Sequence, residues 1–144
     1  GAFAVIWCAS YLLLTFGLYS ALYLGTALRV ISVGFILSRV LCVLSALTLP
    51  NVRKGGMLCA FTEHAKNRRA VAVMFILSLF CAGGMILLDL WSGLCGAVAA
   101  VAAFGGYRRM AKKQFGGVTG DTSGFFIQIC EFCVLFGALI GGFL

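Results

Sequence analysis

Long apolar runs separated by short polar segments dominate this chain of 144 residues. Their lengths, and the charges between them, define five blocks at 2–24, 30–49, 71–88, 90 to about 104, and 125–144. A bilayer core about 30 Å thick needs about 20 apolar residues per helix. The pattern therefore predicts an all-α polytopic membrane protein with about five transmembrane helices, forming a single transmembrane domain over residues 1–144.

Only Asp89 separates the third block from the fourth, which predicts a tight helical hairpin. Trp91 and Tyr107 are expected to anchor the fourth helix at the two membrane interfaces. In the last block, Gly137 and Gly141 form a GxxxG pattern, which is typical of close helix packing.

Composition supports a membrane environment, since 62% of the residues are hydrophobic and 10% are charged, against about 25% charged residues in ordinary soluble domains. The lipid bilayer is thus an expected partner. The net charge of +7 needs no nucleic acid to explain it, because a basic cytoplasmic surface is usual in inner-membrane proteins. We expect no nucleic-acid partner, and the sequence leaves open whether the protein is a homo-oligomer.

The basic residues orient the helices. Nine of the eleven lie in two polar segments that two spans separate, which places both segments on one side of the membrane. They are Arg53, Lys54, Lys66, Arg68 and Arg69 in the first segment, and Arg108, Arg109, Lys112 and Lys113 in the second. The positive-inside rule predicts that this side is cytoplasmic.

The stretch "FGGVTGDTSG", residues 115–124, is the strongest candidate site. Glycine-rich turns expose backbone N–H groups that can hold a phosphate, and the start of the following helix adds its dipole. Thr122 or Ser123 is expected to cap that helix. Asp121 would repel a phosphate unless a cation such as Mg²⁺ lay between them. Two interpretations stay open: a magnesium-dependent diphosphate site, or a turn in which Asp121 merely caps the helix.

Two charged residues lie inside predicted spans, Arg39 in the second and Glu131 in the last. Charges in the membrane interior usually pair or face a wet cavity. Arg39 therefore either forms a structural pair with Glu131 or binds a substrate phosphate with help from Ser38, and the two roles are compatible. Gly124, Gln128, Glu131 and Leu135 are expected to form one stripe facing the bundle or a wet cavity.

These features resemble a known family. The run "GGVTGDTSG", with basic residues before it and Glu131 after it, is similar to the C-terminal signature of cobalamin synthase, the adenosylcobinamide-GDP ribazoletransferase. Residues 37–61, with Ser38 and Arg39 followed by a proline turn, are similar to the family's middle section.

The resemblance implies a Mg²⁺-dependent transferase of the bacterial inner membrane that joins adenosylcobinamide-GDP to α-ribazole or its 5′-phosphate and releases GMP. Asp121 would be a metal ligand, and Asp121 and Glu131 would be catalytic. The remaining implied site residues would bind substrate: Ser38, Arg39, Lys112, Lys113, Gly116, Gly117, Thr119 and Gly120. A different class of function, a transporter or channel subunit with a polar path through Arg39 and Glu131, is the alternative.

The chain departs from the family pattern in two places. The family's aspartate-rich motif, DGxxDxxDG, does not occur in these 144 residues, and Gln128 stands where the pattern has a glutamate. We therefore expect this chain to be the C-terminal portion of a longer protein and to hold an incomplete active site by itself. A role for Gln128 beyond hydrogen bonding is not expected.

Overall fold

The computed structural model describes residues 1–21, 26–52, 57–63 and 66–143, and helices account for most of them. Six helices follow one another along these residues. They are α1 (Ala2–Ala21), α2 (Thr26–Thr48), α3 (Met57–Glu63), α4 (Arg68–Leu88), α5 (Leu90–Gln114) and α6 (Gly120–Gly142). All except the short α3 are long and apolar enough to cross a membrane. The prediction of a multi-pass helical membrane protein with five spans is confirmed.

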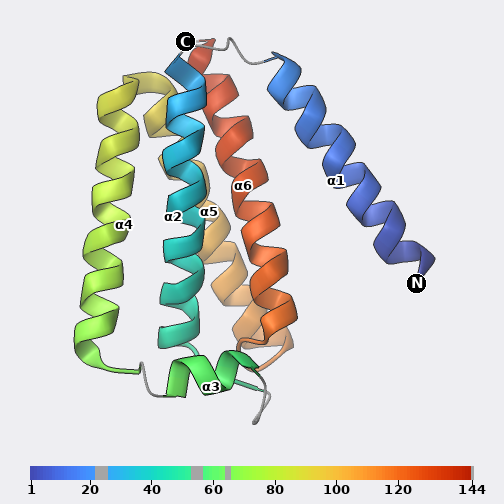
Figure 1. Cartoon of the computed structure of the whole chain (residues 1–144), viewed down its shortest axis with the longest axis vertical. Coiled ribbons are helices and arrows are strands. Elements are labelled where there is room, and N and C mark those ends of the chain that lie inside the picture. Colours follow the sequence, from blue (N-terminus) through green and yellow to red (C-terminus); the bar gives the residue numbers. More distant parts are fainter. Residues whose placement is uncertain (22–25, 53–56, 64–65, 144) are drawn as a thin grey trace.

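Helices α2, α4, α5 and α6 form a bundle in which α2 contacts each of the other three (Figure 1). The most buried of the five spans is α2. Its Ile31 and Leu37 belong to the same core as Met85 of α4 and Val134 of α6. Because lipid tails are as apolar as these side chains, close packing of this kind holds the spans together in the membrane.

Helix α1 stands apart from that bundle. None of its residues is buried, and its main packing partner is α6. Figure 1 shows α1 leaning away, with its N-terminal end farther from α6 than its C-terminal end. Trp7 lies over Phe125 with ring centroids 5.9 Å apart, which is one of the few contacts that hold α1.

Small residues let α5 and α6 approach closely, and this pair shares the most extensive contact of the fold. A Cβ atom on Gly137 would lie 2.7 Å from the Cys95 carbonyl oxygen, and one on Gly141 would lie 2.5 Å from Cα of Ser92. No side chain fits at either position, so the packing role predicted for these two glycines is confirmed.

The hairpin predicted between the third and fourth blocks is also confirmed. Helix α4 ends and α5 begins on either side of Asp89, whose backbone N–H donates to the Met85 carbonyl at 3.3 Å. Gly93 on the first turn of α5 then faces the backbone of Met85 without room for a Cβ.

Two predicted helix boundaries are wrong. Helix α5 continues past Phe104 to Gln114, so the basic residues 108–113 lie on its last turns rather than in a loop. Helix α6 begins at Gly120 instead of Phe125. Tyr107 is also not an interfacial anchor: it is 6% exposed and stacks on Phe126 with centroids 4.7 Å apart.

Both basic segments lie at one end of the bundle, where α3, the start of α4 and the end of α5 meet (Figure 1). Lys66 contributes there by donating from Nζ to the carbonyl of Leu49 at 3.2 Å, which satisfies a backbone group just past the end of α2. Arg53 and Lys54 lie outside the described residues. The prediction that the two basic segments lie on one side of the membrane therefore agrees with the described parts of each.

Candidate functional site

The turn before α6 is held against the segment that follows α2. The Val118 N–H donates to the Pro50 carbonyl at 2.9 Å, and the Val52 N–H donates to the Val118 carbonyl at 3.3 Å. These bonds form a short parallel bridge between Asn51 and Val118. Gly117 allows this approach, because any Cβ there would overlap the Pro50 carbonyl oxygen. Two segments more than sixty residues apart thus form one surface.

Most backbone N–H groups of the turn already have acceptors. Gly117 N–H donates to the Ala111 carbonyl at 3.0 Å, Val118 N–H donates to Pro50, and Thr119 N–H donates to Thr122 Oγ1 at 2.9 Å. These three amides are not free to hold a phosphate, so the expected cradle over 116–120 is smaller than the sequence indicates. Gly116 is exposed and has a φ of 70°, which suits glycine.

The helix cap is Thr119, not Asp121. Its Oγ1 accepts from the Thr122 N–H at 3.2 Å, while Thr122 Oγ1 accepts from the Thr119 N–H, which makes a reciprocal capping box. The expectation that Thr122 or Ser123 is the capping residue is wrong, and so is the alternative in which Asp121 caps the helix. The N–H groups of Gly120 and Asp121, the first two of α6, have no acceptor in the described part of the chain.

Among the described residues, the Asp121 carboxylate in the first turn of α6 likewise has no hydrogen-bond partner, and it lies beside these two amides. It is exposed and lines an open groove of about 470 Å³. The residues around this groove are Met110, Phe115, Thr119, Asp121, Thr122 and Phe125. Lys112 and Lys113 lie exposed in the last turn of α5, just before Phe115. The arrangement offers a carboxylate, helix-start amides and lysines at the basic end of the bundle.

A magnesium ion fits this site only in part. Mg²⁺ commonly takes one or two protein carboxylates and fills its other positions with waters and substrate phosphates. Asp121 can be one such ligand, since its carboxylate is exposed. Over the described ranges, however, no group of three or more His, Cys, Asp or Glu side chains could hold a metal. The described residues thus supply at most one wall of a metal site.

A second polar cluster lies deeper in the membrane. Arg39 Nη1 donates to Glu131 Oε1 at 2.6 Å, which confirms the predicted ion pair. The Tyr11 hydroxyl donates to the other carboxylate oxygen at 3.3 Å, and Ser38 Oγ lies 3.5 Å from Oε1. The cluster therefore joins α1, α2 and α6. Glu131 is 13% exposed, whereas the Arg39 side chain is 57% exposed.

The two polar groups lie at different depths. Residues 121–131 are helical throughout, so Asp121 and Glu131 are separated by about 15 Å along α6. One metal ion cannot contact both. Arg39 is likewise nine residues, about 14 Å, from the end of α2, whereas Lys112 and Lys113 lie at the end of α5. The structure gathers the substrate-binding candidates into an outer group around Asp121 and an inner group around Arg39.

The stripe predicted along α6 is not uniform. Leu135 is 1% exposed in the core and Glu131 is partly buried, as expected for a face toward the bundle. Gln128 is half-buried, but Gly124 is exposed. Only the deeper part of the stripe therefore faces the bundle.

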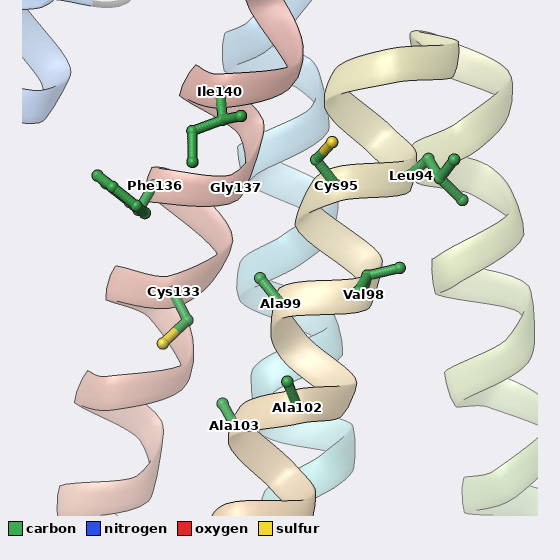
Figure 2. A pocket seen from close by; sticks show the side chains of 10 residues that line it. All are labelled: Leu94, Cys95, Val98, Ala99, Ala102, Ala103, Cys133, Phe136, Gly137 and Ile140. Atoms are coloured by element: carbon green, nitrogen blue, oxygen red, sulfur yellow. The ribbon is translucent and has the colours of Figure 1, made fainter.

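A separate apolar groove of about 500 Å³ lies between α5 and α6 (Figure 2). Figure 2 shows small side chains of α5, such as Ala99 and Ala102, along one wall, and Phe136 and Ile140 of α6 along the other. None of the ten residues that line it is charged. This groove lacks charged side chains that could bind a phosphate, and it is not part of the candidate site.

The sequence did not indicate several groups that build the site. Tyr11 reaches Glu131 across 120 residues, and Pro50 and Val52 fix the turn from a distant segment. Tyr107 donates to Thr122 Oγ1 at 3.4 Å and so supports the cap of α6. The T-x-x-T spacing of Thr119 and Thr122 was the one local signal, since it fits a threonine-based capping box.

Comparison with known proteins places these features in a family context. The family model described as Cobalamin-5-phosphate synthase matches residues 1–139. A protein of Lachnoclostridium phytofermentans named adenosylcobinamide-GDP ribazoletransferase is 33% identical over 131 residues, which is 91% of this chain and 50% of that protein. A protein of the same name from Pseudomonas syringae pv. syringae is 28% identical over 135 residues, 94% of this chain and 54% of the relative.

A third relative with that name, from Pseudomonas putida strain GB-1, is 37% identical over 95 residues, 66% of this chain and 36% of its own length. The chain thus spans about half the length, or less, of these curated relatives. No solved structure matches it.

Proposed function

The chain belongs to the cobalamin-5-phosphate synthase family, and from this we propose that the full-length protein is an adenosylcobinamide-GDP ribazoletransferase. Its substrates would be adenosylcobinamide-GDP and α-ribazole or its 5′-phosphate, and its products adenosylcobalamin or its 5′-phosphate together with GMP. The names of the relatives support this activity. Neither the family nor the relatives give any support to the transporter or channel alternative.

The observation that carries the proposal is the free Asp121 carboxylate beside the first two amides of α6, at the basic end of the bundle. A diphosphate needs N–H donors and positive charge, and this end provides both. The Gly120 and Asp121 amides would contact phosphate oxygens, and Lys112 and Lys113 would neutralise the GDP side. Thr119 and Gly117 would position the turn through their own hydrogen bonds rather than touch substrate.

In the proposed reaction, a hydroxyl oxygen of the ribazole forms a bond to the corrinoid-side phosphorus, and the phosphorus–oxygen bond to GMP breaks. GMP leaves with the electron pair, and the hydroxyl proton passes to solvent. Mg²⁺, when bound, would supply positive charge at the phosphate oxygens. Asp121 would hold it as one ligand, and the other protein ligands would come from outside the described residues, as the aspartate-rich motif of the family implies.

The inner group would contact another polar part of the substrates. A guanidinium has five N–H donors, and one of Arg39 is bonded to Glu131. The remaining donors are suited to an anionic group of either substrate. Ser38 is fully buried and its hydroxyl donates to the Phe35 carbonyl at 2.8 Å, so it would help to position Glu131 rather than touch substrate. Because Glu131 is about 15 Å from Asp121, we assign it a positioning role for Arg39 and not a role at the reacting phosphorus.

We also propose that the membrane is a bacterial inner membrane and that the basic end, with the Asp121 groove, faces the cytoplasm. The test uses full-length protein in proteoliposomes supplied with adenosylcobinamide-GDP and α-ribazole or its phosphate. We expect GMP and the corrinoid product in equal amounts, and loss of both when Mg²⁺ is chelated. Movement of α-ribazole across the membrane without GMP formation would contradict the proposal.

A further inference from the structure

Helix α2 carries one exposed stripe on an otherwise buried surface. Leu28, Ile36, Arg39 and Val43 are 46%, 55%, 57% and 44% exposed, and their spacing places them on one helix face. Ser32, between them, is also exposed. We call these five residues the α2 stripe. It runs through the middle of the membrane, since Arg39 lies about 14 Å from one end of α2 and about 20 Å from the other.

Lipid is an unsuitable neighbour for this stripe. Hydrocarbon offers no acceptor to the guanidinium donors that Glu131 leaves free, and charged groups inside membranes consistently face protein or a wet cavity. The ion pair also fixes Arg39 in depth, because Glu131 is at the midpoint of α6. Helix α1 does not cover the stripe, since its main contact is with α6 and none of its residues is buried.

We propose that the α2 stripe is the docking face for a transmembrane helix from the part of the protein outside these 144 residues. Two curated relatives match nearly all of this chain with only 50% and 54% of their own length, so about as much chain again lies outside the match. The docked helix would present apolar residues to Leu28, Ile36 and Val43. Near Arg39 it would line a wet cavity with oxygen acceptors, so that the guanidinium stays accessible to the substrate anion proposed above.

A second copy of this chain fits the stripe less well. A two-fold contact centred on the stripe would set two Arg39 side chains against each other. A guanidinium has donors and no acceptor, so neither side chain could satisfy the N–H groups that Glu131 leaves free on the other.

The test is photo-crosslinking of full-length protein in native membranes, and it does not depend on transferase activity. The photoreactive residue p-benzoylphenylalanine replaces Ile36 or Val43 on the α2 stripe. It replaces Phe80 as the control, because Phe80 is 78% exposed on α4 and has no charged neighbour in its helix. Gel filtration in detergent verifies that each variant remains folded, and mass spectrometry identifies the joined peptides.

We expect the probes at Ile36 and Val43 to join, within one molecule, a peptide from outside the 144 residues, at a yield several-fold above that of Phe80. Three outcomes would overturn the proposal: crosslinked dimers, crosslinks confined to α1, or yields no higher than at Phe80. Any of these could occur in an active transferase, so failure of this inference is separate from failure of the proposed function.

Discussion

Replacement of Gly117 by alanine tests how the turn before α6 is positioned. The new Cβ would overlap the Pro50 carbonyl oxygen and lie 3.0 Å from Cγ2 of Val52. Overpacking of this kind costs about 1–3 kcal/mol. Separation of the two segments would also weaken the backbone bonds at 2.9 Å and 3.3 Å that join Val118 to Pro50 and Val52, at about 0.5–1.5 kcal/mol each. We expect the free energy of unfolding to fall by about 2–6 kcal/mol in total.

Two neighbouring glycines provide matched controls. A Cβ on Gly120 meets nothing within 4 Å, so Gly120→Ala should change stability by less than about 0.5 kcal/mol. A Cβ on Gly116 also meets nothing, but φ there is 70°, and alanine in that region costs about 1–2 kcal/mol. The predicted order of destabilisation is therefore Gly117→Ala, then Gly116→Ala, then Gly120→Ala.

The assays are denaturant unfolding of the full-length variants in detergent and GMP release per folded molecule in proteoliposomes. A displacement of about 1 Å in a positioning group can lower turnover about 100-fold, so Gly117→Ala should lose most of its activity even where it remains folded. Equal stability and turnover for Gly117→Ala and Gly120→Ala would show that the close approach of Gly117 to Pro50 does not position the turn.

Two further changes examine the spans. In a double-mutant cycle, Arg39→Leu and Glu131→Leu should show coupling of about 0.6–1.7 kcal/mol in unfolding experiments, the range for polar contacts between membrane helices; additive effects would mean that the ion pair contributes no stability. Gly141→Leu should destabilise the α5–α6 contact by about 1–3 kcal/mol, because its Cβ would lie 2.5 Å from Cα of Ser92. Gly83→Leu should be near neutral, since a Cβ at Gly83 meets nothing, and equal losses for the two would contradict the packing.

The sequence predicted the spans well because a helix that crosses the membrane needs a long block of apolar residues. Boundaries were harder. The four basic residues at 108–113 are expected to lie in a loop between the fourth and fifth apolar blocks, yet they continue α5. Basic side chains are well placed at the C-terminal end of a helix, where they favour its negative dipole end. The apolar content of a segment alone therefore does not reveal that basic residues can extend a helix at its C-terminal end.

The candidate site was predictable in part. Arg39 and Glu131 were expected to pair because a charge inside a span needs a partner, and the structure shows the pair. The use of the turn amides was not predictable, since their acceptors include Pro50, far away in the sequence. Local glycine content indicates where a backbone can approach another group. It does not indicate whether that group is a ligand or the protein's own carbonyl.

The most direct test of the account is GMP release by full-length Asp121→Asn as Mg²⁺ is varied, with Asp89→Asn as the control. Both changes remove one carboxylate charge, but Asp89 lies in the turn between α4 and α5, at the end of the bundle opposite the groove. We predict that Asp121→Asn remains folded in detergent, loses most of its turnover and requires more Mg²⁺, while Asp89→Asn behaves as the unaltered protein. Normal turnover and an unchanged Mg²⁺ requirement in Asp121→Asn would contradict the account.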